Sequence, residues 1–237
     1  MSNKLTYLLI DGGAILFPLI FSVHSKINFY KEWKAFWLAN LVTSFIFILW
    51  DIYFTQIGIW GFNEDYITGL KIFNLPVEEV LFFICIPYSS VFTYYCLKLF
   101  CPDLRKNFSS TISVVLIFIL LLISIFNFQK LYTLVTCISL ASLICCITFV
   151  FKNKWLNVFY LMYLIILLPF FIVNGILTGT GLDAPIVWYN NSENMSLRIL
   201  TIPVEDVFYG MLLLLLNVLL FERFKKEPPT NNLEGSV

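Results

Sequence analysis

Seven long apolar runs constrain the fold of this chain more than any other feature of its sequence. They cover roughly residues 5–23, 35–53, 77–97, 110–128, 131–150, 157–177 and 204–222. A helix needs about 20 mostly apolar residues to cross the hydrocarbon core of a bilayer, and each run has about that length. Only 13% of the residues are charged, whereas soluble domains have about 25%. We therefore expect an all-α membrane protein with seven transmembrane helices.

The basic residues are divided unevenly between the two sides of this expected bundle. Eleven lie in the loops at 24–34, 98–106 and 152–154 and near the C-terminus, and four (Lys4, Lys71, Lys130 and Arg198) lie on the other side. Because Lys and Arg are enriched in cytoplasmic loops, we expect a multi-pass protein of the cell membrane with its N-terminus outside and its C-terminus in the cytoplasm. The net charge is zero, so the sequence gives no sign of a basic surface for nucleic acid. The apolar runs make the lipid bilayer an expected partner.

A short acidic motif occurs twice, each time at the start of an apolar run. The copies read Pro76-Val77-Glu78-Glu79 and Pro203-Val204-Glu205-Asp206 and lie 127 residues apart. A loop with Trp and Asn precedes each copy: Trp60 and Asn63 in the first, Trp188 and Asn190 in the second.

This duplication predicts two parallel repeats, in which helices 1–3 match helices 5–7. An even number of crossings separates matching helices, so both motifs lie at the same membrane depth and can face one central cavity. The expected division is a first repeat at 1–106, a linker helix at 107–130, a second repeat at 131–224 and a disordered polar tail at 225–237.

The four carboxylates have two interpretations. Acids in the first turn of a helix stabilise its dipole and are often simply solvated, but ionisable groups that border hydrocarbon are rare and usually functional. Adjacent helical residues point about 100° apart, so both acids of one motif cannot face one substrate. We expect Glu78 and Glu205 to face inward. Glu79 and Asp206 would cap their helices or hold Arg198 or an Asn of the preceding loop, and all four remain catalytic candidates.

The aromatic residues near the motifs suggest a chemistry for these acids. Two carboxyls in different environments can act as an acid and a base, and aromatic faces stabilise cations. The candidates for these faces are Trp60, Phe82, Phe83, Trp188 and Tyr209. Such a site suits protonation of an apolar alkene followed by its rearrangement, with Asn63, Asn190 and Arg198 as further candidate substrate contacts.

The doubled Pro-x-Glu-[Glu/Asp] motif, together with its preceding Trp/Asn loops, resembles the integral-membrane lycopene cyclase family in the form that fuses two homologous halves. The resemblance covers essentially residues 5–222. It implies redox-neutral cyclisation of lycopene ψ-ends to β-rings through γ-carotene, with lycopene and carotenoid intermediates as partners, and it allows contact with other carotenoid enzymes. The chain has no G-x-G-x-x-G, so no nucleotide cofactor is evident. The 127-residue offset places Thr178 opposite Asp51, so a role of Asp51 would not be duplicated.

Other functions remain open at this stage. A small-molecule transporter can also be built from parallel 3+1+3 repeats, although the polar residues here gather at one membrane edge rather than at its middle. A retinal-binding photoreceptor needs a lysine inside a span, and none of the seven predicted spans contains one. A di-iron hydroxylase needs several histidines, but the single histidine of the chain is His24, which lies in a loop. An assembly protein without catalytic activity is the remaining alternative.

Overall fold

The computed structural model describes residues 3–101, 109–151 and 155–225. Within them, seven helices are long and apolar enough to cross a membrane, so the predicted class is confirmed. They are α1 (Thr6–Ser22), α2 (Trp33–Gln56), α3 (Val77–Phe100), α4 (Ser109–Phe126), α5 (Leu131–Cys145), α6 (Leu156–Leu177) and α7 (Val204–Phe224). A π-helical turn at Cys146–Phe151 extends α5, and short 3₁₀ helices, Asn3–Leu5 and Phe29–Glu32, precede α1 and α2. The predicted repeat boundary at 106–107 lies outside the described residues, and so does the predicted tail at 225–237 except for Lys225, which forms an ion pair with Glu32 at 3.3 Å.

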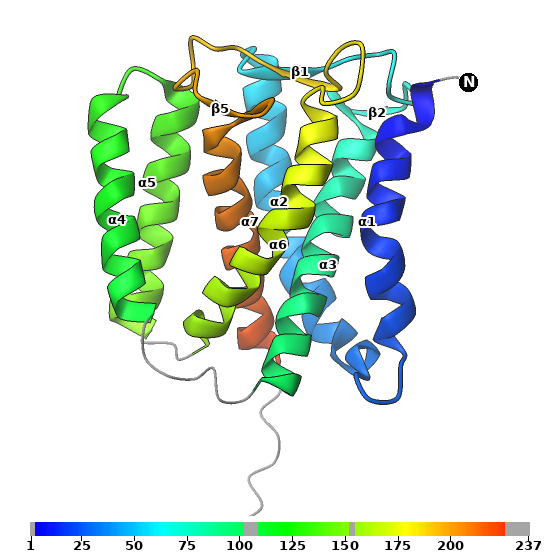
Figure 1. Ribbon diagram of the computed structural model, residues 1–237, viewed down its shortest axis with the longest axis vertical. Helices are drawn as coiled ribbons and strands as arrows, with labels where there is room; N and C mark the ends of the chain where they lie inside the picture. Colours follow the sequence, from blue (N-terminus) through cyan, green and yellow to red (C-terminus); the bar gives the residue numbers. More distant parts are fainter. Residues whose placement is uncertain (1–2, 102–108, 152–154, 226–237) are drawn as a thin grey trace, which may run out of the picture.

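Three small antiparallel sheets lie at the end of the bundle that also holds the N-terminus (Figure 1). In the first sheet, β1 (Trp60–Phe62) pairs with β4 (Val187–Tyr189). The other two are hairpins: β2 (Lys71–Ile72) pairs with β3 (Leu75–Pro76), and β5 (Arg198–Ile199) pairs with β6 (Ile202–Pro203). Pro76 and Pro203 therefore end a hairpin and stand just before α3 and α7, with an extended ψ of 149° and 138°.

The two halves of the chain make the same loop contacts 127 residues apart. Asn63 N–H donates to the Ile186 carbonyl and Asn190 N–H donates to the Ile59 carbonyl, both at 2.8 Å. Gly61 pairs with Trp188 in the sheet, and these two residues are also 127 residues apart in the sequence. The loops of the two halves therefore contact each other reciprocally; the arrangement of the helices as two parallel repeats stays a prediction.

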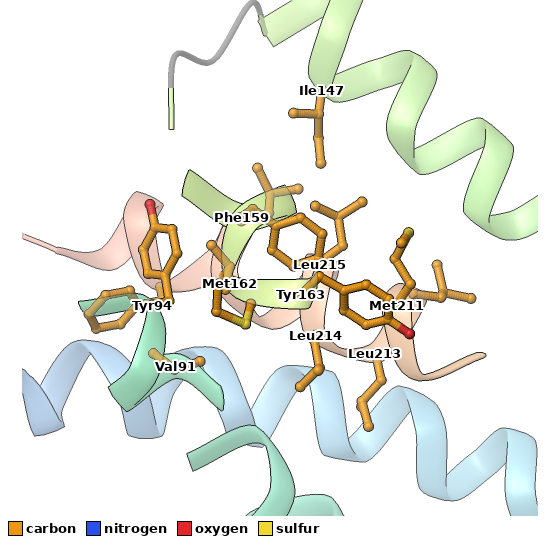
Figure 2. Close-up of a cluster of buried hydrophobic side chains, with 14 of the residues drawn as sticks. Val91, Tyr94, Ile147, Phe159, Met162, Tyr163, Met211, Leu213, Leu214 and Leu215 are labelled. Atoms are coloured by element: carbon orange, nitrogen blue, oxygen red, sulfur yellow. The ribbon is translucent and has the colours of Figure 1, made fainter. Parts of the chain in front are cut away.

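Helix α7 lies at the centre of the bundle. Its most apolar stretch is 61% buried, against 17% for α1 and for α4 at the periphery. Helix α7 packs on α2 and α5, whereas α3 packs on α1, α2 and α6, and α4 packs on α5 (Figure 1). Figure 2 shows the core between α6 and α7, where Phe159, Met162 and Tyr163 lie among Met211, Leu214 and Leu215. The first turns of α3 and α7 both reach one cavity that the β1–β4 sheet also lines.

Candidate active site

A cavity of about 70 Å³ lies between the β1–β4 sheet and the helices. Strand residues Trp60, Phe62, Val187 and Tyr189 contribute to one wall. Three carboxylic side chains line it, namely Asp51 of α2, Glu79 of α3 and Asp206 of α7. No Lys, Arg or His is found among the described residues that line the cavity. Acid groups from both halves of the chain thus share one largely aromatic and aliphatic space.

The inward-facing acids are not those that the sequence analysis favoured. Glu78 and Glu205 are fully buried and do not line the cavity. Each accepts a hydrogen bond from the loop before its helix: Thr68 N–H donates to Glu78 Oε1 at 2.7 Å, and Met195 N–H to Glu205 Oε1 at 2.6 Å. The preceding hairpin folds back over the helix start, so the first acid of each motif is used to anchor the loop.

Glu79 and Asp206, the second acids of the motifs, face the cavity and are held by tyrosines. Tyr7 Oη donates to Glu79 Oε2 at 2.6 Å. Tyr132 Oη donates to Asp206 Oδ1 at 2.7 Å, and Tyr189 Oη donates to Asp206 Oδ2 at 2.9 Å. Burial, with the nearby Asp206 charge, raises the pKa of the Tyr189 phenol well above its usual value, so Tyr189 keeps its proton and remains a donor. Both Asp206 oxygens are occupied in this way, whereas among described residues only one Glu79 oxygen receives a hydrogen bond.

Asp51 is a third acid of the site and lies in the last two turns of the apolar helix α2 (Trp33–Gln56). Its side chain is 1% exposed, and Trp60 Nε1 donates to its Oδ1. Its Oδ2 has no hydrogen-bond partner among the described residues. A buried polar atom without a partner is costly, which is typical of functional positions rather than of packing.

The counterpart of Asp51 is Asn174, not Thr178. Ile59 N–H donates to the Phe54 carbonyl, and Ile186 N–H donates to the Leu177 carbonyl, at 3.0 and 2.9 Å. The second connection is four residues longer than the first, so α2 and α6 match at an offset of 123. Asn174 lines the cavity as Asp51 does, so the duplicated position carries an amide in place of the carboxyl.

Three of the predicted aromatic residues do line the cavity: Trp60, Phe82 and Tyr209. The Trp60 ring lies 5.2 Å from the Tyr132 ring and 6.0 Å from the Tyr209 ring, measured between centroids in edge-to-face geometry. The reacting end of a substrate in this space would therefore meet ring faces and edges from both halves of the chain.

The remaining predicted contacts lie elsewhere. Phe83 is buried against Phe47, and Trp188 is 45% exposed on the other side of the sheet from the cavity, above Gly61. The side-chain oxygens of Asn63 and Asn190 accept N–H groups two residues on and fix their own turns. Arg198 donates to the Thr201 carbonyl and to Asn191 Oδ1, and so closes the second hairpin. None of these five residues is part of the cavity wall.

The sequence analysis missed Tyr7, Tyr132, Tyr189 and Asn174. Tyr7 and its counterpart Tyr132 are 125 residues apart, and Asp51 and Asn174 are 123 residues apart. The two motifs are 127 residues apart, so a comparison of the halves at that one spacing aligns neither pair. A search that allowed each helix its own offset would have found the two tyrosines, because each follows the start of its helix by one residue. Among the described residues, no group of three or more His, Cys, Asp or Glu is arranged to hold a metal ion.

Comparisons with known proteins agree with the two-part organisation. A family model described as lycopene cyclase matches residues 4–97 and 129–224. A bifunctional lycopene cyclase/phytoene synthase of Aspergillus niger is 42% identical over 45 residues, which is 19% of this chain and 8% of that protein. Proteins with the same description from Leptosphaeria maculans (33% over 86 residues) and Pyrenophora tritici-repentis (40% over 74) match 36% and 31% of this chain. These matches span 14% and 12% of the two relatives. No solved structure matches the chain.

Proposed function

The chain belongs to the lycopene cyclase family, and we propose that it closes β-rings at the ψ-ends of lycopene, giving γ-carotene and then β-carotene. The observation that carries this proposal is the cavity in which Glu79 and Asp206, from opposite halves, meet among aromatic side chains. An acid, a base and a lining that tolerates positive charge are what the reaction needs. The membrane-spanning helices fit a substrate that is dissolved in the bilayer.

The reaction is an isomerisation and needs no oxidant or reductant. An acid donates a proton to C2 of the terminal double bond, which leaves a cation at C1. The C5=C6 π-electrons attack C1 and form the C1–C6 bond, so the positive charge moves to C5. A base then removes the proton on C6, and the electrons of that C–H bond become the C5=C6 double bond of the β-ring. One proton enters and one leaves, so no cofactor is required by the balance.

We assign the proton donor to Glu79 and the proton acceptor to Asp206. An ionised carboxylate only accepts hydrogen bonds, and Asp206 accepts one at each oxygen, from Tyr132 and Tyr189. Glu79 accepts one, from Tyr7, at Oε2, which leaves Oε1 to carry a proton toward the substrate. The Trp60 indole N–H donates to Asp51 Oδ1, and this hydrogen bond orients a ring that can stabilise the cation.

The aromatic walls have a second role in this scheme. Trp60, Phe82 and Tyr209 line the cavity, and their ring faces stabilise the passing cation. They also exclude water, which would otherwise capture the cation as an alcohol.

The uneven basic residues support an orientation with the carboxylate end of the bundle outside the cell and the C-terminus in the cytoplasm. Phe73 is 84% exposed in the turn of the β2–β3 hairpin. A Phe73→Cys variant should therefore react with an impermeant thiol reagent in intact cells. Reaction only after permeabilisation would reverse the orientation.

Pigment analysis in a lycopene-accumulating host tests the function. We expect the chain to convert lycopene to γ-carotene and β-carotene, with the Glu79→Gln variant as the inactive control. If the intact protein is present in the membrane and lycopene is the sole pigment, the proposed function is wrong. In deuterated water each ring should gain one deuterium at C2. Asp206→Asn should form rings far more slowly, and the little product that remains should include altered ring types or alcohols, because the base is removed.

A further inference from the structure

A second hollow adjoins the acidic cavity and runs between α1 and α6 across α3. Its volume is about 240 Å³. Its walls include Ala14 and Pro18 of α1, Ser89 and Thr93 of α3, and Ile166 and Val173 of α6. Phe82, Ile86, Phe170, Asn174 and Leu214 line both this groove and the acidic cavity. The two spaces are thus neighbours with a common wall.

We propose that this α1–α6 groove binds the conjugated chain of the polyene while one end group lies among the acids, and that the chain enters it sideways from the bilayer. The inference rests on the proposed function, since it names where the rest of the same substrate lies. The acidic cavity, at about 70 Å³, is smaller than the groove, at about 240 Å³, so the groove is the larger neighbouring space for the rest of a long substrate.

The length and the surface of the groove suit a linear apolar molecule. From Phe82 to Thr93, at about 1.5 Å of rise per residue, α3 extends about 16 Å along the groove, which is half of the about 30 Å hydrocarbon thickness. Two of the hydroxyls in its wall are already used: Ser89 Oγ donates to the Ala14 carbonyl and Thr93 Oγ1 donates to the Ser89 carbonyl, both at 2.8 Å. The groove therefore offers the polyene a mostly apolar surface.

The matching positions in the other half of the chain carry larger side chains. At the helix offsets found above, Val173 corresponds to Trp50, Ser89 to Leu216 and Thr93 to Leu220. The Trp50 ring packs 5.5 Å from the Tyr209 ring and 5.7 Å from the Phe47 ring, so it occupies the space that Val173 leaves open. Among the described residues, the acids of the two motifs thus have counterparts, whereas these three groove positions are taken by larger side chains in the other half.

This asymmetry has a consequence for the reaction. With one groove, the substrate presents one end group at a time, and the second end reaches the acids only after the molecule leaves and returns reversed. We infer that the protein releases the monocyclic intermediate into the bilayer between the two ring closures.

Filling the groove tests the proposal. Val173→Trp copies the residue of the other half and should reduce ring formation in a lycopene-accumulating host at least tenfold at equal protein level. Val115→Trp is the matched control, because Val115 is 51% exposed on the outer face of α4; it should keep the parental yield. If the parent forms rings and both variants form them equally well, the groove proposal is wrong while the proposed function stands. If the parent forms none, the proposed function itself has failed.

A second measurement covers the case that Val173→Trp does not fold. Thr93→Cys in the inactive Glu79→Gln protein is placed in phospholipid vesicles, and labelling of residue 93 by a bulky maleimide is followed by mass spectrometry. Lycopene in the vesicles should slow this labelling at least fivefold, with no change at Cys145, which is exposed. Equal labelling rates with and without lycopene would mean that lipid chains or nothing occupy the groove, and would overturn the proposal.

Discussion

At the scale of single residues, the two adjacent acids of each motif have different surroundings. The sequence predicts that one of them faces inward, because neighbours on a helix point about 100° apart. It does not show which one. That depends on the loop before each helix, whose N–H groups at Thr68 and Met195 donate to the first acid, so that the second acid faces the cavity.

Removing the first acid should therefore affect stability. Glu78→Ala leaves the partly buried Thr68 N–H without its acceptor, and we expect the free energy of unfolding to fall by about 1–3 kcal/mol. The measurement is thermal unfolding in detergent. The control is Glu64→Ala, whose ion pair with Lys71 is exposed and should contribute less than about 1 kcal/mol. Equal unfolding temperatures for the two variants would contradict the loop-anchoring role of Glu78.

At the scale of elements, the β1–β4 sheet joins the two halves over the cavity. Each loop carries one Trp near its start, which suggests from the sequence that Trp60 and Trp188 are counterparts. The register shows otherwise: Trp188 pairs with Gly61, and the counterpart of Trp60 is Val187. A one-residue difference in register reverses the face on which a strand side chain lies, so Trp60 points to the cavity and Trp188 does not.

The close approach of Gly61 and Trp188 gives a prediction for this sheet. A Cβ on Gly61 would lie 2.3 Å from Trp188 Cζ2, so Gly61→Ala must displace the indole and should cost about 1–3 kcal/mol of stability. Gly13→Ala is the matched control, because its Cβ would meet nothing within 4 Å and alanine favours a helix by about 0.5–1 kcal/mol. Thermal unfolding should show opposite signs for the two variants; the same sign would contradict the packing described.

At the scale of the whole molecule, one site is made from both halves. The sequence predicts seven spans and a shared cavity from composition, run length and the duplicated motif, and one acid of each motif does line the same cavity. The tyrosines and Asn174 could not be placed by the same comparison. Because the loops around α5 and α6 differ in length from those of the first half, each pair of matching helices has a different spacing in the sequence. Only the folded structure shows which side chains meet.

A chain divided in two tests this shared site. Fragments 1–106 and 107–237, produced together, should restore ring formation, because Glu79 and Tyr7 come from the first and Asp206, Tyr132 and Tyr189 from the second. Either fragment alone should form no rings in a lycopene-accumulating host. Ring formation by fragment 1–106 alone, at a rate near that of the intact chain, would contradict a site built from both halves.

The most direct test of the account compares the two acids within each motif. Glu79→Gln and Asp206→Asn should each lower ring formation by about 10²–10⁴-fold, since an amide neither donates nor accepts the proton. Glu78→Gln and Glu205→Gln should stay within about tenfold of the parent, because an amide oxygen still accepts the loop N–H. The measurement is the initial rate of cyclic carotenoid formation at equal amounts of membrane-inserted protein. If 78 and 205 prove essential while 79 and 206 are dispensable, the cavity between α3 and α7 is not where the ring closes.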